Sequence, residues 1–187
     1  MKNIAIFASG DGSNAEAIAQ HFKNSTIACV KIVLSNRQKA GVHERMKAID
    51  IPSITFSKED WKDCSAILSL LQDNNIDLIV LAGFLCIIEP SIIKNYKGRI
   101  INIHPSLLPK HGGPGMWGHH VHDAVISAGE KESGITIHYV TEEVDGGEII
   151  FQDSCPVKPD DTATTLASRI HTLEHIHYPL VIEKILK

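Results

Sequence analysis

Short runs of β-branched and other apolar residues alternate with segments of helical periodicity over most of this chain. Parallel strands need a crossover connection, which is usually a helix that covers one face of the sheet. The alternation therefore predicts an α/β fold, with a doubly wound, mostly parallel sheet and helices on both of its faces. The expected strands cover residues 3–9, 27–34, 54–56, 77–82 and 99–104, and the expected helices cover 15–22, 42–49, 58–74 and 89–95.

The pattern changes after residue 104. Residues 109–118 contain four glycines and two prolines, which predicts a long irregular loop. The remaining expected elements are a helix over 119–128, antiparallel strands over 134–139 and 148–156, and a helix over 162–186 with a bend near Pro179. We find no repeat, no low-complexity tract and no linker, so residues 1–187 are expected to form one domain.

The composition is that of an ordinary globular protein, with 43% hydrophobic and 21% charged residues among 187. A net charge of −4 argues against nucleic acid as the main partner, which would favour a basic surface. The four cysteines form no CxxC pair, which argues against structural zinc. No signal peptide and no apolar stretch near the roughly 20 residues needed for a bilayer are found, so we expect a cytoplasmic protein.

Asn102 and His104 lie two residues apart in the strand predicted before Pro105. Side chains two apart in a strand point to one face of the sheet, so the amide and the imidazole are expected side by side. Together they could polarise and protonate a substrate oxygen. They could instead be polar groups that close a strand and a turn, since Pro105 and Pro109 stiffen the exit loop.

A glycine-rich loop, Gly10-Asp-Gly-Ser-Asn14, follows the first strand and opens a helix. Backbone N–H groups at such a helix start can hold an anion, and Ser13 and Asn14 add side-chain donors. The spacing also satisfies the Gly-x-Gly-x-x-Ala dinucleotide pattern, but the second strand ends in Ser-Asn-Arg37 rather than in an acid, which suits NADP better than NAD. Phosphate binding, dinucleotide binding and a structural turn therefore all remain open.

Asp145 is followed by two glycines and lies between two predicted strands. This turn could be a simple hairpin device, or it could bring the carboxylate to His104 across the sheet. In the second case the carboxylate would favour a charged imidazolium and give both groups a role in proton transfer.

Four further histidines lie close together in the sequence and could be considered as metal ligands. His111, His119, His120 and His122 cluster in the sequence, but no matching carboxylate or cysteine spacing accompanies them. We interpret them as solvated loop and helix residues and expect no metal. Glu174-His175 is interpreted as a pair on a helix surface.

Taken together, these motifs resemble the folate-dependent formyltransferase family, in the family's order and over almost the whole chain. The segments that carry the resemblance are Gly10–Asn14, Leu81–Phe84, Asn102–Pro109, Val144–Gly147 and Glu174-His175. The central segment with the aspartate turn is specific for users of N10-formyltetrahydrofolate. The Gly-Ser-Asn loop points to a ribonucleotide substrate. The resemblance implies a Rossmann-like formyltransferase fold.

The resemblance also implies roles for individual residues, beginning with a catalytic trio of Asn102, His104 and Asp145. The residues implied to bind glycinamide ribonucleotide are Gly12, Ser13, Asn14 and Glu174; those implied to bind folate are Lys58, Leu85, Cys86, Ile87, Ile88, Asn102, Thr141, Glu142, Glu143, Val144 and Asp145. Residues 1–100 would then be the phosphate- and ribonucleotide-binding half, and 101–187 the catalytic and folate-binding half. Lys58 and Cys86 stand where arginine is more usual, and the loop 110–120 is unusually long and glycine-rich.

The implied reaction transfers the formyl group of N10-formyltetrahydrofolate, a co-substrate, to the amine of glycinamide ribonucleotide in purine biosynthesis. Asn102 and protonated His104 would stabilise the oxyanion, while Asp145 would raise the imidazole pKa. The expected partners are these two small molecules, with no nucleic acid and no membrane, and the protein is expected to be a monomer or homodimer.

Other activities remain as alternatives. Another N10-formyltetrahydrofolate-dependent N-formyltransferase or hydrolase would share the central segment, but those relatives resemble longer proteins with additional domains. An NADP-binding reductase would explain Gly10, Gly12, Ala15 and Arg37, yet it gives no reason for the catalytic trio. A non-catalytic ligand-binding module of the same fold would not need the trio at all.

Overall fold

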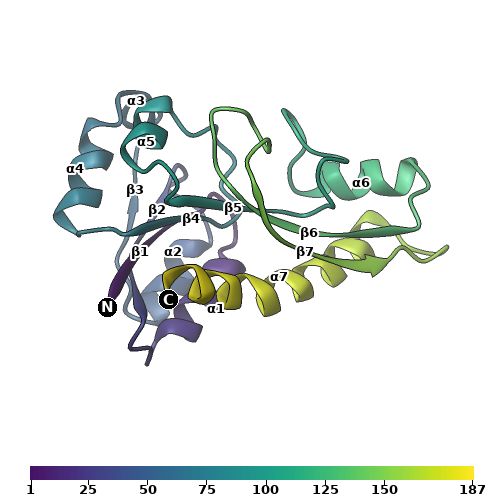
Figure 1. The fold of residues 1–187 in the computed structure, drawn as a ribbon, viewed down its shortest axis with the longest axis horizontal. Helices are drawn as coiled ribbons and strands as arrows, with labels where there is room; N and C mark the ends of the chain where they lie inside the picture. The colour runs from purple at the N-terminus through teal and green to yellow at the C-terminus, as the bar shows by residue number, and fades with distance from the viewer.

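A seven-stranded mixed sheet forms the centre of the computed structural model, which describes residues 1–187 (Figure 1). Its strands are β1 (Lys2–Phe7), β2 (Ala28–Ser35), β3 (Ser53–Thr55), β4 (Leu78–Leu81), β5 (Ile100–His104), β6 (Glu132–Tyr139) and β7 (Ile149–Pro156). They lie in the order β3-β2-β1-β4-β5-β6-β7. The pairs among β1 to β5 are parallel, and β6 and β7 add antiparallel pairs. This confirms the predicted fold class.

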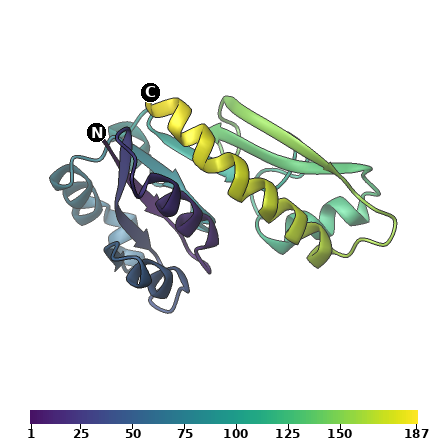
Figure 2. The same cartoon turned by 90° about the horizontal axis from the view of Figure 1, so that it is seen from below.

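Helices cover both faces of the sheet because its strands are apolar on both sides. Ile6 contributes to one core with α1, α2, α6 and α7, whereas its neighbour Phe7 contributes to a second core with α3, α4 and α5. The helices are α1 (Ser13–Phe22), α2 (Val42–Ala48), α3 (Lys58–Asp63), α4 (Ser65–Asp73), α5 (Pro90–Asn95), α6 (His119–Ser127) and α7 (Ala163–Leu186). Figure 2 shows α7 lying along its face of the sheet beside α1. The Tyr178 hydroxyl of α7 donates to the Leu81 carbonyl oxygen at 2.9 Å.

Two expected elements differ from the structure. The helix predicted over 58–74 is two helices, because Cys64 between them adopts a left-handed conformation with φ 62°. The strand predicted to start at residue 134 begins at Glu132. The last helix passes through Pro179 and continues to Leu186, as predicted.

The chain reverses its direction of travel across the sheet between β1 and β4, which are neighbours. At such a switch point the loops after the two strands diverge and leave a crevice at the carboxyl ends of the strands. The two chain ends lie side by side, near the amino end of β1 and therefore at the opposite edge (Figures 1 and 2). None of the helices has the length and apolar character needed to cross a membrane.

Candidate active site

A cavity of about 540 Å³ opens at the carboxyl ends of β1, β4 and β5. It is lined by every residue expected in a site except Lys58, that is by Gly12, Ser13, Asn14, Leu85, Cys86, Ile87, Ile88, Asn102, His104, Thr141, Glu142, Glu143, Val144, Asp145 and Glu174. Lys58 is the exposed first residue of α3 and does not line the cavity, so its assignment to the folate site stays a prediction from the resemblance.

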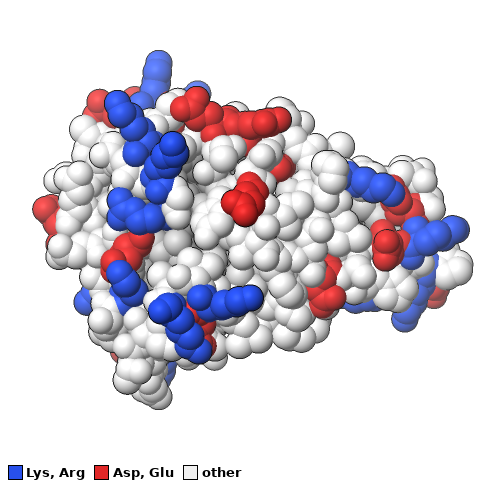
Figure 3. All heavy atoms as spheres, in the orientation of Figure 1, with Lys and Arg blue, Asp and Glu red and all other residues white.

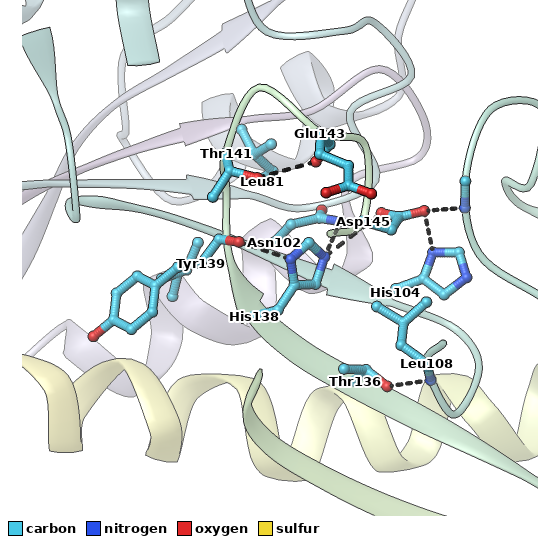
Figure 4. A network of polar contacts seen from close by, with 12 residues as sticks. Leu81, Asn102, His104, Leu108, Thr136, His138, Tyr139, Thr141, Glu143 and Asp145 are labelled. Carbon is cyan, nitrogen blue, oxygen red and sulfur yellow. Dashed lines mark hydrogen bonds and ion pairs between the residues drawn. The ribbon is translucent and has the colours of Figure 1, made fainter. Parts of the chain in front are cut away.

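Asn102, His104 and Asp145 meet in this cavity (Figure 4). Asn102 and His104 lie two residues apart on β5 and therefore share one face of the sheet. Asp145 comes from the loop between β6 and β7. The His104 Nδ1 lies 3.5 Å from the Asp145 Oδ2, and the Gly113 N–H donates to the same oxygen at 2.9 Å. Asp145 itself has φ 55°, so the left-handed residue of this turn is the aspartate.

Gly147, the second glycine after Asp145, permits a close approach of backbone to backbone. A Cβ atom on Gly147 would lie 1.7 Å from the Tyr139 carbonyl oxygen, which no side chain can do. The turn therefore holds its carboxylate in place by packing directly on the end of β6.

His138 is a fourth polar residue of the site that sequence reasoning missed. It stands opposite Asn102 in the antiparallel pairing of β6 with β5 and is 2% exposed. Its Nε2 lies 3.2 Å from the Asn102 Nδ2 and 3.6 Å from the Asp145 Oδ1. Asp145 thus lies between two imidazole rings (Figure 4). The sequence does show Thr136 and His138 as polar residues two apart in a predicted strand. Placing His138 opposite Asn102 also requires the register of the strand pairing, which the sequence does not give.

The protonation expected for His104 is wrong for the free protein. Burial lowers the pKa of His104 below its ordinary value and outweighs the opposing influence of the Asp145 carboxylate. The ring is therefore neutral near pH 7. Its Nε2–H donates to the His111 carbonyl oxygen at 2.8 Å, which leaves a lone pair on Nδ1.

Asp145 is a carboxylate under the same conditions. Burial works to raise the pKa of Asp145, but the flanking histidines and the Gly113 N–H together bring this pKa below its usual value. The site therefore pairs a neutral imidazole with a negative charge.

The start of α1 forms the other end of the cavity. Gly12 has φ 83°, and a Cβ atom there would lie 2.6 Å from the Val42 Cα atom, so only glycine fits between loop and α2. α1 has no side-chain cap, and its first residues, Ser13 and Asn14, line the cavity. Such a helix start suits an anion.

Asn14 and Glu174 form a buried pair at this end. The Asn14 amide donates from Nδ2 to the Glu174 Oε2 at 2.8 Å, so this donor binds protein rather than being free for an anion. Glu174 is 5% exposed, and burial raises its pKa against the effect of the Asn14 hydrogen bond. The interpretation of Glu174 as a helix-surface residue is therefore wrong, while His175 is exposed as expected.

The clustered histidines divide into two kinds. His119 and His120 are exposed as expected, but His122 is 3% exposed, and its Nδ1 has no hydrogen-bond partner. Burial lowers the pKa of His122 to about 4. No group of three or more His, Cys, Asp or Glu side chains is arranged to hold a metal ion.

The family model described as formyl transferase matches residues 2–182. The chain belongs to the formyl transferase family. It is 41% identical over 194 residues to phosphoribosylglycinamide formyltransferase of Bacillus subtilis, with 100% of this chain and 95% of that protein covered. It is 39% identical to the trifunctional purine biosynthetic protein adenosine-3 of Drosophila melanogaster, over 95% of this chain and 13% of that protein.

Solved structures agree with the family assignment. The crystal structure of phosphoribosylglycinamide formyltransferase from Bacillus halodurans matches with a TM-score of 0.91 and 38% identity, over 100% of this chain and 96% of that one. The formyl transferase fold is thus present from end to end.

Within this formyl transferase, the segment Leu85–Ile88 forms one cavity wall. The Leu85 N–H donates to the Ser9 hydroxyl at 2.8 Å, which ties the segment to the end of β1. Cys86 is exposed and accepts a hydrogen bond from the Asn36 amide at 2.9 Å. Neither Lys nor Arg lines the cavity of this formyl transferase.

Proposed function

We propose that this chain transfers the formyl group of N10-formyltetrahydrofolate to the amine of glycinamide ribonucleotide, giving formylglycinamide ribonucleotide and tetrahydrofolate in purine biosynthesis. The observation that carries the proposal is the meeting of Asn102, His104 and Asp145 in one cavity with a free helix start. The full-length similarity to phosphoribosylglycinamide formyltransferases supports the choice of substrate.

The two substrates enter this cavity from different sides. The phosphate of the ribonucleotide binds at Gly12, Ser13 and Asn14, where the α1 backbone N–H groups offer an anion site. Glu174, held by Asn14, receives the amine end of glycinamide. The folate lies against Leu85–Ile88 and Thr141–Asp145, so both chain halves contribute to its site.

The reaction begins when the amine attacks the formyl carbon, and the formyl oxygen becomes an oxyanion. The Asn102 amide has one N–H directed to His138 and a second N–H that can donate to this oxygen. One such preorganised donor contributes on the order of 3 kcal/mol to transition-state stabilisation.

Proton transfer then completes the exchange. Neutral His104 takes the proton that the attacking amine loses, directly or through a water, and becomes an imidazolium. In that form Nδ1–H faces Asp145 and Nε2–H faces the His111 carbonyl, so both hydrogens have acceptors. The imidazolium gives the proton to N10 as the carbon–nitrogen bond breaks, which returns His104 to its neutral state.

The deciding experiment mixes the protein with glycinamide ribonucleotide and N10-formyltetrahydrofolate and follows the deformylated folate, beside an enzyme of known activity. We expect folate turnover that depends on the ribonucleotide. Turnover without the ribonucleotide would identify a hydrolase, and binding of a nicotinamide cofactor in a titration would favour a reductase. Ligand binding with no formyl transfer to any amine would leave only a binding module.

A cytoplasmic location and a monomeric or homodimeric state stay predictions from the sequence. The assignment of ribonucleotide binding to residues 1–100 and of catalysis to 101–187 is likewise a proposal. In our proposal Glu174, from residues 101–187, binds the ribonucleotide, and Leu85–Ile88, from residues 1–100, binds the folate. Each half therefore contributes to both substrate sites.

A further inference from the structure

We propose that His138 is a positioning residue that fixes the amide of Asn102 in the one orientation useful for catalysis, an inference that rests on the proposed function. His138 is buried on β6, directly opposite Asn102 on β5, and both line the cavity. Figure 4 shows its ring between the end of β6 and the catalytic groups.

The hydrogen position on the His138 ring follows from its neighbours. Nδ1 lies 2.9 Å from the Tyr139 carbonyl oxygen. A carbonyl oxygen only accepts hydrogen bonds, so Nδ1 must carry a hydrogen and donate it. In the neutral ring Nε2 then has a lone pair and no hydrogen.

This lone pair selects the orientation of the amide. The Asn102 Nδ2 lies 3.2 Å from the His138 Nε2 and donates one of its two hydrogens to it. If the amide were turned over, Oδ1 would face the same lone pair, and two acceptors would be opposed. His138 therefore keeps the NH₂ group on this side and leaves its second N–H for the oxyanion.

No other side chain of the trio offers a free N–H to replace it. The His104 Nε2–H donates to the His111 carbonyl, and the His104 Nδ1 faces Asp145. The orientation of Asn102 thus decides whether the site can donate to the developing charge, and His138 decides that orientation.

The test is a double-mutant cycle between positions 138 and 102, after the wild-type protein has been shown to formylate glycinamide ribonucleotide. We expect His138→Phe to lower kcat about 10- to 100-fold, with KM for both substrates within about threefold. In an Asn102→Ala background the same substitution is expected to lower kcat by less than about threefold. His138→Gln, whose amide oxygen can accept from Asn102, should recover part of kcat.

An equal loss of kcat in both backgrounds would overturn the proposal, because His138 would then act through Asp145, 3.6 Å away, or on its own. A rise in KM with unchanged kcat would overturn it as well. His177→Phe changes a half-buried histidine of α7 that lies beside Asp153 and outside the cavity, and it is the matched histidine control; thermal unfolding of each variant checks the fold. If His138→Phe does not fold, the cycle is run with His138→Gln, whose partial loss should vanish in the Asn102→Ala background. An inactive wild-type protein would reject the proposed function, whereas an active one with additive losses rejects only this inference.

Discussion

His104 has a hydrogen-bond acceptor at each ring nitrogen and almost no contact with solvent. The His111 carbonyl lies 2.8 Å from Nε2 and the Asp145 carboxylate 3.5 Å from Nδ1, while the residue is 3% exposed. Burial penalises a lasting charge on the ring, but a proton that arrives during the reaction finds both N–H groups provided with acceptors. In the proposed reaction, His104 would therefore carry a positive charge only briefly.

Removing either partner of this pair should stop turnover. We expect Asp145→Asn and His104→Ala each to lower kcat at least about 100-fold while KM changes little, because the lost interactions act on the transition state. Steady-state kinetics with both substrates measure this. Glu148→Gln, an exposed acid just beyond the same turn, is the control. Near-wild-type turnover in either variant would remove the pair from the mechanism.

His122 should make the fold sensitive to acid. The unfolded chain protonates this ring below about pH 6.5, but the folded protein does so only near its lowered pKa of about 4. Stability present at pH 7 is therefore lost as the pH falls between these values, by about 2 kcal/mol at pH 5.

Urea unfolding at pH 7 and pH 5 tests this. The decrease in unfolding free energy should be about 2 kcal/mol smaller in His122→Leu than in the wild type. His119→Leu changes an exposed neighbour on α6 and should behave as the wild type. The same decrease in all three proteins would show that His122 is not the group responsible.

At the scale of elements, the conformation of the loop before α1 requires glycine at position 12 but not at position 10. Gly12→Ala places a Cβ atom 2.6 Å from Val42 at a positive φ, so the loop and α2 must separate. We expect a loss of about 2 kcal/mol in unfolding free energy and a rise in KM for the ribonucleotide. Gly10→Ala has no atom within 4 Å of the new Cβ and should be nearly neutral. Equal effects of the two substitutions would contradict this account.

Most helices and strands could be predicted from the sequence because the spacing of their apolar residues matches the faces that they bury in the fold. The break between α3 and α4 could not, because it rests on the left-handed backbone of a buried cysteine, a residue with no such preference. Its cause is tertiary: Trp61 and Cys64 turn into the core beside Phe7.

The candidate site divides in the same way. Asn102, His104 and Asp145 stand out in the sequence because polar residues interrupt apolar runs or follow them. Glu174 reads as a surface residue until α7 is packed beside α1, where Asn14 meets it. The contact of His138 with Asn102 depends on strand register, which the sequence of one chain does not supply.

For the whole molecule, the absence of cationic side chains from the cavity is the main electrostatic fact. Lys and Arg lie mostly toward the two ends of the face in Figure 3, whose middle is largely uncharged with a few acidic groups. The chain carries a net charge of −4. In the proposed function, binding of the substrate phosphate would therefore depend on short-range backbone N–H donors rather than on long-range attraction.

Salt should accordingly have little effect on substrate affinity. We expect KM for the ribonucleotide to change less than about twofold between about 50 and 200 mM NaCl, since contact interactions are screened far less than distant charges. Initial rates at fixed folate concentration measure this. A KM that rises more than about fivefold would show that surface lysines or arginines reach the bound phosphate.

The neighbouring chain ends have a practical consequence. Figures 1 and 2 show both chain ends at the amino end of β1, on the edge away from the cavity at the carboxyl ends of the strands. A second protein joined at either end would not obstruct the entrance. A segment that matches this chain makes up 13% of the Drosophila trifunctional protein, where it is joined to further sequence in one polypeptide.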